Sequence, residues 1–128
     1  MLKKTITFTD YNEVERTEDF YFNLTKTEVS EIELSITGGL VKMLERIIQE
    51  QDTKKVLELL KDIVHRAYGE KSVDGRRFIK NQELLDSFIQ TEAYNELFFE
   101  LITNADTTAN FINAIIPQIK KETTEEVN

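Results

Sequence analysis

The spacing of apolar residues changes once along this chain, after residue 24. In residues 1–24 apolar and polar residues alternate, which is the period of a β-strand with one buried face. The segment "DYNEV" interrupts the alternation and contains the turn-forming residues Asp10 and Asn12. We therefore predict a β-hairpin whose apolar face must pack on helices or on another chain, because an isolated hairpin is only marginally stable. The alternating apolar residues are Ile6, Phe8, Phe20, Phe22 and Leu24.

From residue 25 onward the apolar residues recur every three or four positions, as they do on one face of an α-helix. The sequence "TKTE" (Thr25–Glu28) has the form of a capping box, in which a threonine and a glutamate satisfy each other's free backbone N–H groups. Gly38-Gly39 is expected to end this helix. A later helix carries a wide apolar stripe from Val56 to Tyr68 and is expected to end at Gly69.

The start and end of the last three helices are also marked in the sequence. Asn81 and Thr91 are candidate N-caps, because their side-chain oxygens can accept hydrogen bonds from backbone N–H groups in the first turn. Asp106 is expected to begin the last helix. Pro117 lies inside the last apolar pattern, and proline removes a helical hydrogen bond, so we predict a kink or an end near Ile116.

These patterns predict an α+β fold that is mainly α, with an N-terminal β-hairpin followed by about six helices in one compact domain. The hairpin occupies residues 1–24, the helical body residues 25–119, and a frayed tail residues 120–128. A chain of 128 residues suits a single domain.

Composition excludes several classes of protein. The chain has no cysteine, which excludes disulfides, thiolate catalysis and cysteine-ligated metals. No segment approaches the roughly 20 apolar residues that span a bilayer, and the N-terminus lacks the apolar stretch of a signal peptide. The net charge of −8 argues against anionic membranes and nucleic acid as main partners. We expect a soluble protein of the cytoplasm.

The sequence contains no recognisable catalytic motif: no glycine-rich phosphate loop, nucleophile elbow or metalloprotease signature. His65 is the only histidine, and on a helical wheel it lies opposite the apolar stripe, near Asp62. It is interpreted as a solvated surface residue rather than as part of an acid–base pair or metal site, because a metal site needs three or four convergent ligands. We expect no enzymatic activity, no cofactor and no metal.

One segment reverses the sign of the charge. Within residues 69–80, "GEKSVDGRRFIK", the net charge is +4 − 2 = +2. Three interpretations remain open: a solvated turn built on Asp74-Gly75, a nucleic-acid site in which Phe78 stacks on a base, or a protein-binding loop whose arginines face an acidic partner. The basic residues of this segment are Lys71, Arg76, Arg77 and Lys80.

The segments "YNELFFELI" and "NFINAII" near the C-terminus are richer in large apolar residues than a helix packed on one side requires. Either both helices are central to the core, or part of their surface binds a partner. The aromatic face of the hairpin is a second candidate surface. The candidate partner-binding residues are Phe99, Phe111, Ile112, Ile116, Phe20 and Phe22.

Three segments together resemble the tail assembly chaperones of long-tailed phages and prophages of Gram-positive bacteria. They are "KKTITFTDYNEVERTEDFYFNLTKTE", "YGEKSVDGRRFIKNQE" and "TEAYNELFFELI", and the resemblance extends to about Pro117. The most specific parts are "VERTEDFYFNLT" and "EKSVDGRRFIK". One departure is Glu13 in the hairpin turn, where the family often has glycine.

The resemblance implies a non-catalytic protein that binds the long, aggregation-prone tape-measure protein in the host cytoplasm. It also implies help in recruiting major tail tube subunits and absence from the finished virion. In many relatives a ribosomal frameshift appends a second domain, and Lys120-Lys121 is a candidate slippery site for it. The alternative from another class is a small regulatory or nucleic-acid-binding protein that uses the basic segment of residues 71–80.

The basic segment also suggests self-association, with Arg76 and Arg77 of one copy facing an acidic surface of the next. A contact between two different surfaces of this kind is expected to build rings or open helices rather than two-fold dimers.

Overall fold

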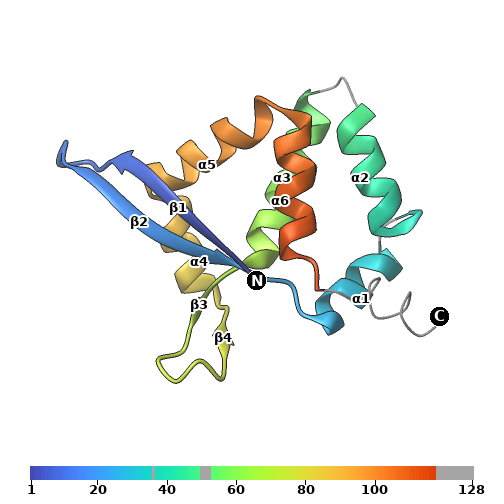
Figure 1. Cartoon of the computed structure of the whole chain (residues 1–128), viewed down its shortest axis with the longest axis horizontal. Coiled ribbons are helices and arrows are strands. Elements are labelled where there is room, and N and C mark those ends of the chain that lie inside the picture. The colour runs from blue at the N-terminus through green and yellow to red at the C-terminus, as the bar shows by residue number, and fades with distance from the viewer. Residues whose placement is uncertain (36, 50–52, 118–128) are drawn as a thin grey trace.

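The computed structural model describes residues 1–35, 37–49 and 53–117 (Figure 1). An antiparallel sheet lies against a set of helices, which confirms the predicted α+β, mainly α, class. The predicted tail of residues 120–128 and the Lys120-Lys121 pair lie outside the described residues. The elements are β1 (Leu2–Thr9), β2 (Glu15–Phe22), α1 (Lys26–Ser35), α2 (Gly39–Gln49), α3 (Thr53–Ala67), β3 (Tyr68–Lys71), β4 (Phe78–Ile79), α4 (Gln82–Ile89), α5 (Glu92–Ile102) and α6 (Ala105–Ile115).

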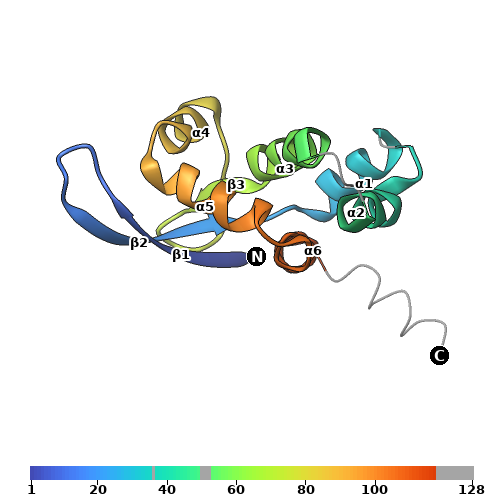
Figure 2. The same cartoon turned by 90° about the horizontal axis from the view of Figure 1, so that it is seen from above.

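Strands β1 and β2 form the predicted hairpin, paired from Leu2↔Phe22 to Thr9↔Glu15. Their alternation separates two faces, since Ile6 is buried and its neighbour Thr7 is exposed. Helices α4 and α5 cover the apolar face, whereas none of the described helices covers the opposite face (Figure 2). The hairpin therefore contributes one wall of the core, as its sequence pattern required.

The geometry of this hairpin turn shows why glycine is favoured at the position that Glu13 occupies. The Glu13 N–H donates to the Asp10 carbonyl at 2.9 Å, and the Asp10 N–H donates to the Val14 carbonyl at 2.9 Å. This is a type I turn followed by a residue in the left-handed conformation, a common three-residue hairpin loop. Glu13 is that residue, with φ of 63°. Glycine adopts this conformation without the steric penalty of a Cβ atom.

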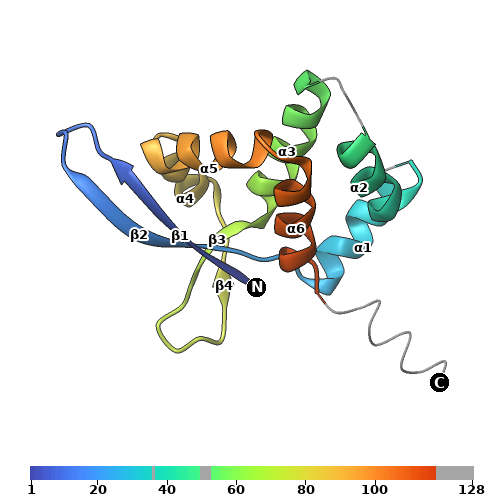
Figure 3. The same ribbon diagram turned by 45° about the horizontal axis from the view of Figure 1, so that its top comes forward.

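Helix α5 runs along the hairpin and is held near both ends. The Tyr11 hydroxyl in the turn donates to Glu92 Oε1 at 2.8 Å, at the start of the helix. The Lys4 ammonium contacts Glu100 Oε1 at 2.6 Å, near its end. Figure 3 shows α1 and α2 at the opposite end of the molecule from the hairpin tip, beyond α6.

Several predicted helix boundaries are confirmed. Thr25 and Glu28 form the capping box: the Thr25 N–H donates to Glu28 Oε1 at 2.9 Å, and the Glu28 N–H donates to Thr25 Oγ1 at 3.1 Å. Asn81 and Thr91 cap α4 and α5 through their side-chain oxygens. Helix α6 ends at Ile115, directly before the Ile116 C-cap and Pro117, as proline requires.

Two boundaries differ from the sequence-based prediction. Helix α6 begins at Ala105, because Asn104 is the N-cap and its Oδ1 accepts hydrogen bonds from the N–H groups of Asp106 and Thr107. Helix α3 ends at Ala67 rather than at Gly69. Tyr68 is instead the first residue of β3, where it pairs with Phe22 of β2.

Strands β3 and β4 form a second hairpin where the sequence predicted a helix end and a loop. Strand β3 adds to the edge of β2 through two residue pairs, and β4 adds to β3, giving the order β1-β2-β3-β4. Gly69 permits this close packing, since a Cβ atom there would lie 2.6 Å from the Ile79 carbonyl oxygen. Strands this short show no alternation, so their sequence carried no detectable strand signal.

The core is centred on Phe88 of α4, around which four aromatic side chains from β2, β3 and α5 gather. Tyr68 stacks on it with ring centroids 4.3 Å apart and planes 12° apart. Phe20 and Phe22 lie at 5.2 and 5.8 Å, and Tyr94 meets it edge-on at 5.4 Å. This cluster joins the sheet to the helices. Aromatic pairs of this kind contribute about 0.5–1.5 kcal/mol each beyond the area they bury.

Candidate partner-binding surfaces

The six candidate partner-binding residues fall into three groups by exposure. Phe22, Phe111 and Ile112 are buried in the core, where Phe22 and Phe111 meet edge-on with centroids 5.3 Å apart. Phe20 and Ile116 are half-buried against the same core. Phe99 alone among the six has most of its side chain in solvent. The excess of apolar residues in α5 and α6 is therefore mainly explained by the core.

Phe99 has an exposed apolar neighbour on the same helix. Its relative exposure is 69%, and that of Ile102, three residues later, is 40%. Residues three apart lie on one face of a helix, so these two side chains form one apolar patch, called the α5 patch below. Glu96 and Glu100 are exposed on the same helix. Helical spacing places Ile102 beside the buried Leu101, and only the packing of α5 reveals that Ile102 is exposed.

His65 differs from its predicted role as a solvated surface residue. It is half-buried, and its Nε2 lies 2.7 Å from the Tyr94 hydroxyl of α5. Burial lowers the pKa of His65, as does the nearby Lys61, while Asp62 acts in the opposite direction. Helix α3 contacts both α5 and α6, so its buried arc is wider than a one-sided stripe and includes this histidine. The contact joins α3 to α5.

Across residues 1–35, 37–49 and 53–117, no three acidic, histidine or cysteine side chains are placed to hold a metal ion. None of the helices formed by these residues has the length and apolar character needed to cross a bilayer.

The basic segment forms the tip of the second hairpin, and we call residues 71–78 the finger (Figure 1). Ser72 organises it: its N–H donates to the Arg77 carbonyl at 2.9 Å, and its hydroxyl donates to Asp74 Oδ1 at 2.7 Å. Asp74 also accepts from the Arg76 N–H at 3.0 Å, and these hydrogen bonds lower the pKa of its carboxyl. Gly75 has a φ of 76°, which completes the turn. The finger is thus ordered by its own hydrogen bonds.

The four cations of this segment have different surroundings. The Lys80 ammonium contacts both carboxylate oxygens of Glu28, at 2.7 and 2.8 Å. The Lys71 ammonium lies over the Tyr21 ring, 4.7 Å from its centroid. Arg76 and Arg77 are exposed, and their guanidinium groups make no ion pair with any described residue. Of the four cations, only Arg76 and Arg77 lack a charged or aromatic partner among the described residues.

Phe78, the candidate for base stacking, packs inside the hairpin. It is half-buried, its Cε2 would lie 2.7 Å from a Cβ atom on Gly69, and the Lys80 ammonium lies 5.8 Å from its ring centroid. A stacking platform for bases needs an open ring face beside several free cations. The packing of Phe78 counts against the nucleic-acid interpretation, whereas a solvated turn and a protein-binding loop both remain compatible with the geometry.

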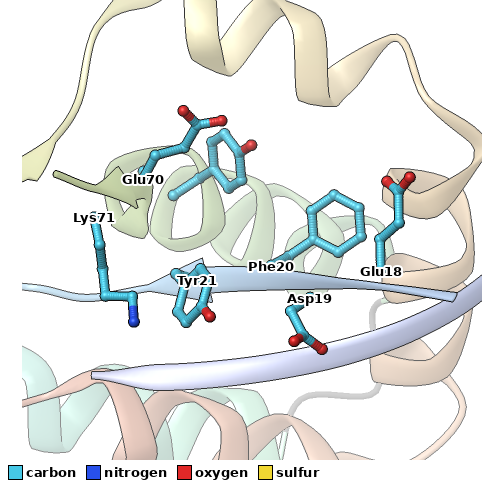
Figure 4. A pocket seen from close by; sticks show the side chains of 8 residues that line it. Glu18, Asp19, Phe20, Tyr21, Glu70 and Lys71 are labelled. Carbon is cyan, nitrogen blue, oxygen red and sulfur yellow. The ribbon is translucent and has the colours of Figure 1, made fainter. Parts of the chain in front are cut away.

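A hollow of about 330 Å³ lies beside the finger, where β3 diverges from β2 after two paired residues. We call it the β2–β3 notch (Figure 4). In Figure 4, Glu18, Phe20 and Glu70 lie on one side of β2, and Asp19 lies on the other. The sequence offered no signal for this hollow, because it depends on the angle between two strands. Its lining residues are Glu18, Asp19, Phe20, Tyr21, Tyr68, Gly69, Glu70 and Lys71.

Comparison with known proteins agrees with the resemblance of the sequence. A family model described as phage tail assembly chaperone matches residues 1–127, which is almost the whole chain. Comparison with curated proteins and with solved structures yields no significant match. The match includes both hairpins, the α5 patch and the finger. The chain therefore belongs to the family of phage tail assembly chaperones.

Proposed function

We propose that this chaperone binds apolar helical segments of the tape-measure protein through the α5 patch and keeps that protein soluble until the tail tube assembles. The observation that carries the proposal is the exposure of Phe99 and Ile102 side by side on α5. Large apolar side chains grouped on a soluble surface are typical of protein-binding sites. Family membership supplies the context, since an assembly chaperone acts on tail proteins.

The surroundings of the patch suit a reversible holding function. The net charge of −8 favours solubility and disfavours binding to anionic surfaces. An amphipathic client helix can lay its apolar face on Phe99 and Ile102. Release then requires the loss of only a small apolar contact, which suits a protein that acts in the host cytoplasm and leaves before the virion is complete.

The role we propose is non-catalytic, and it includes help in recruiting tube subunits. The alternative function, a small regulatory or nucleic-acid-binding protein using residues 71–80, receives less support. Lys80 is paired with Glu28, Lys71 lies over Tyr21, and only Arg76 and Arg77 are left for phosphates. Two cations on an acidic chain are a weak electrostatic footprint for nucleic acid.

The test is co-expression of this chain with the tape-measure protein of the same phage, followed by a pull-down from the soluble fraction. Phe99→Asp places a charge at the centre of the patch and is expected to weaken binding by about 2 kcal/mol, roughly thirtyfold in Kd. The fold should persist, because the side chain is exposed. Circular dichroism and thermal unfolding of the purified variant check this.

Leu34→Asp is the matched control, because Leu34 is also a large apolar residue, 90% exposed, on a different helix. It should leave client binding unchanged. A folded Phe99→Asp variant that binds the client as the wild type does would refute the α5 patch as the site. Equal losses in both variants would indicate a general effect of charge and would also refute it.

A further inference from the structure

We propose that two copies of this chain pair about a two-fold axis, each inserting the tip of its finger into the β2–β3 notch of the other. Residues that client binding does not use carry this pairing, so it is independent of the function proposed above. It assigns a role to the two arginines that the fold leaves unpaired and to the hollow beside them.

The finger presents its side chains outward on an ordered turn. Val73 at its tip is fully exposed, and Arg76 and Arg77 extend from the same turn without an ion pair to any described residue. The hydrogen bonds of Ser72 and Asp74 hold the turn in one conformation. Binding through a preorganised loop loses little conformational entropy.

The notch has the chemistry that an arginine-bearing loop requires. The side chain of Glu70 is exposed, and its carboxylate accepts no hydrogen bond from the described residues. Glu18 has only an exposed contact of 3.3 Å with Arg16. The half-buried rings of Phe20 and Tyr68 lie in the same lining. A guanidinium can pair with a carboxylate through two parallel hydrogen bonds and at the same time stack on an aromatic face.

The backbone of the notch is also open. Strand β3 pairs with Tyr21 and Phe22 only, so the edge of β2 at residues 18–20 has no partner strand among the described residues on that side. A free edge can accept hydrogen bonds from an inserted segment. The occupant is therefore an extended or hairpin segment that carries arginine, and the finger of a second copy matches that description.

The position of the two surfaces determines the symmetry. Strand β3 forms one wall of the notch and one arm of the finger, so the two surfaces adjoin. When a surface and its complement adjoin, a two-fold rotation can bring each onto the other, and the assembly closes at two copies. The ring or open helix expected from sequence would require the surfaces to lie apart.

The first experiment measures the mass of the purified chain by sedimentation velocity over a range of protein and salt concentrations. The wild type should form a dimer that weakens as salt increases, because the contact is electrostatic. Arg76→Glu with Arg77→Glu should weaken the dimer at least roughly tenfold. A wild type that remains monomeric at every concentration overturns the proposal.

Lys55→Glu with Lys61→Glu is the control, since these lysines are exposed and lie on α3, away from the finger. Both double variants change the net charge from −8 to −8 − 4 = −12. Equal effects of the two would reflect general repulsion and would overturn the specific contact.

A charge-swap experiment tests the pairing directly. Glu18→Arg with Glu70→Arg reverses the notch and should weaken the dimer as reversal of the finger does. Mixing the finger variant with the notch variant restores both contacts in a two-fold pair, so heterodimers should form. Failure to form them, while both variants remain folded by circular dichroism, overturns the proposal. Assemblies larger than two would overturn the two-fold arrangement in favour of a head-to-tail chain.

Discussion

Lys80 and Glu28 form an ion pair that joins the second hairpin to the start of α1, with the Lys80 ammonium 2.7 and 2.8 Å from the two carboxylate oxygens. Glu28 Oε1 also accepts the Thr25 N–H of the capping box. Burial raises the pKa of Glu28, but the hydrogen bonds from Lys80 and Thr25 outweigh it, so the pKa is lowered overall. One carboxylate thus caps a helix and fixes a hairpin 52 residues away in sequence.

Lys80→Met should therefore destabilise the fold by about 1–2 kcal/mol, because it leaves a half-buried carboxylate without its cation. Urea unfolding measures the change. Lys42→Met breaks the exposed Lys42–Glu45 pair, whose N–O distance is 3.6 Å, and should change stability by less than about 0.5 kcal/mol. Equal effects of the two substitutions would show that the Lys80–Glu28 pair contributes no more to stability than an exposed ion pair does.

Gly69→Ala should destabilise the second hairpin by about 1–3 kcal/mol. The added Cβ would lie 2.6 Å from the Ile79 carbonyl oxygen and 2.7 Å from Phe78 Cε2, so β3 and β4 must separate. Thermal unfolding gives the magnitude. Gly75→Asn is the control, because a Cβ at Gly75 meets nothing within 4 Å and asparagine tolerates its positive φ. A smaller loss at Gly69 than at Gly75 would contradict the close packing.

Glu13→Gly should stabilise the chain by about 0.5–1 kcal/mol, because glycine removes the strain of a side chain at φ of 63°. The expected result is a higher Tm with an unchanged fold. Asn12→Gly in the same turn should give no gain, since the backbone of Asn12 does not have a positive φ. A Tm for Glu13→Gly at or below that of the wild type would exclude strain at this residue.

His65 should make stability depend on pH near neutrality. Its folded-state pKa is lowered below the ordinary 6.5, so the unfolded chain binds the proton more tightly. Stability is then fully present above about pH 6.5 and decreases as pH falls towards the folded-state pKa. Unfolding curves between neutral and mildly acidic pH measure this slope.

His65→Gln is the matched variant, because glutamine can still hydrogen-bond the Tyr94 hydroxyl but does not titrate. It should flatten the pH dependence in this range. The lowered pKa values of Glu28 and Asp74 act only at lower pH, below their ordinary values of 4.5 and 3.8. An unchanged slope in His65→Gln would assign the pH dependence to other groups.

Local chemistry made much of the fold predictable. The alternation in residues 1–24 predicted a hairpin, and the capping residues Thr25, Asn81 and Thr91 predicted helix starts within one residue. Pro117 predicted the end of α6. Each of these signals acts over a few residues, through a side chain that bonds to, or blocks, its own backbone. Such signals can be read from the sequence alone.

The functional surfaces were less predictable, because they depend on which faces the packing covers. Phe111 and Phe99 were both candidate partner-binding residues from the sequence, yet the first is buried and the second exposed. His65 lies off the apolar stripe, but α5 covers it. Exposure is a property of neighbours far along the chain, and apolar spacing does not specify those neighbours.

The sequence by itself determined the α+β class, the first hairpin, most helix ends and the resemblance to tail assembly chaperones. The tertiary structure decided that β3 and β4 extend the sheet and that Lys80 forms an ion pair with Glu28. It also decided that Arg76 and Arg77 have no ion-pair partner among the described residues. The physical reason is the sequence separation over which each kind of interaction acts. Periodicity and capping are local, whereas a two-residue strand or an ion pair forms only when the folded chain brings distant residues together.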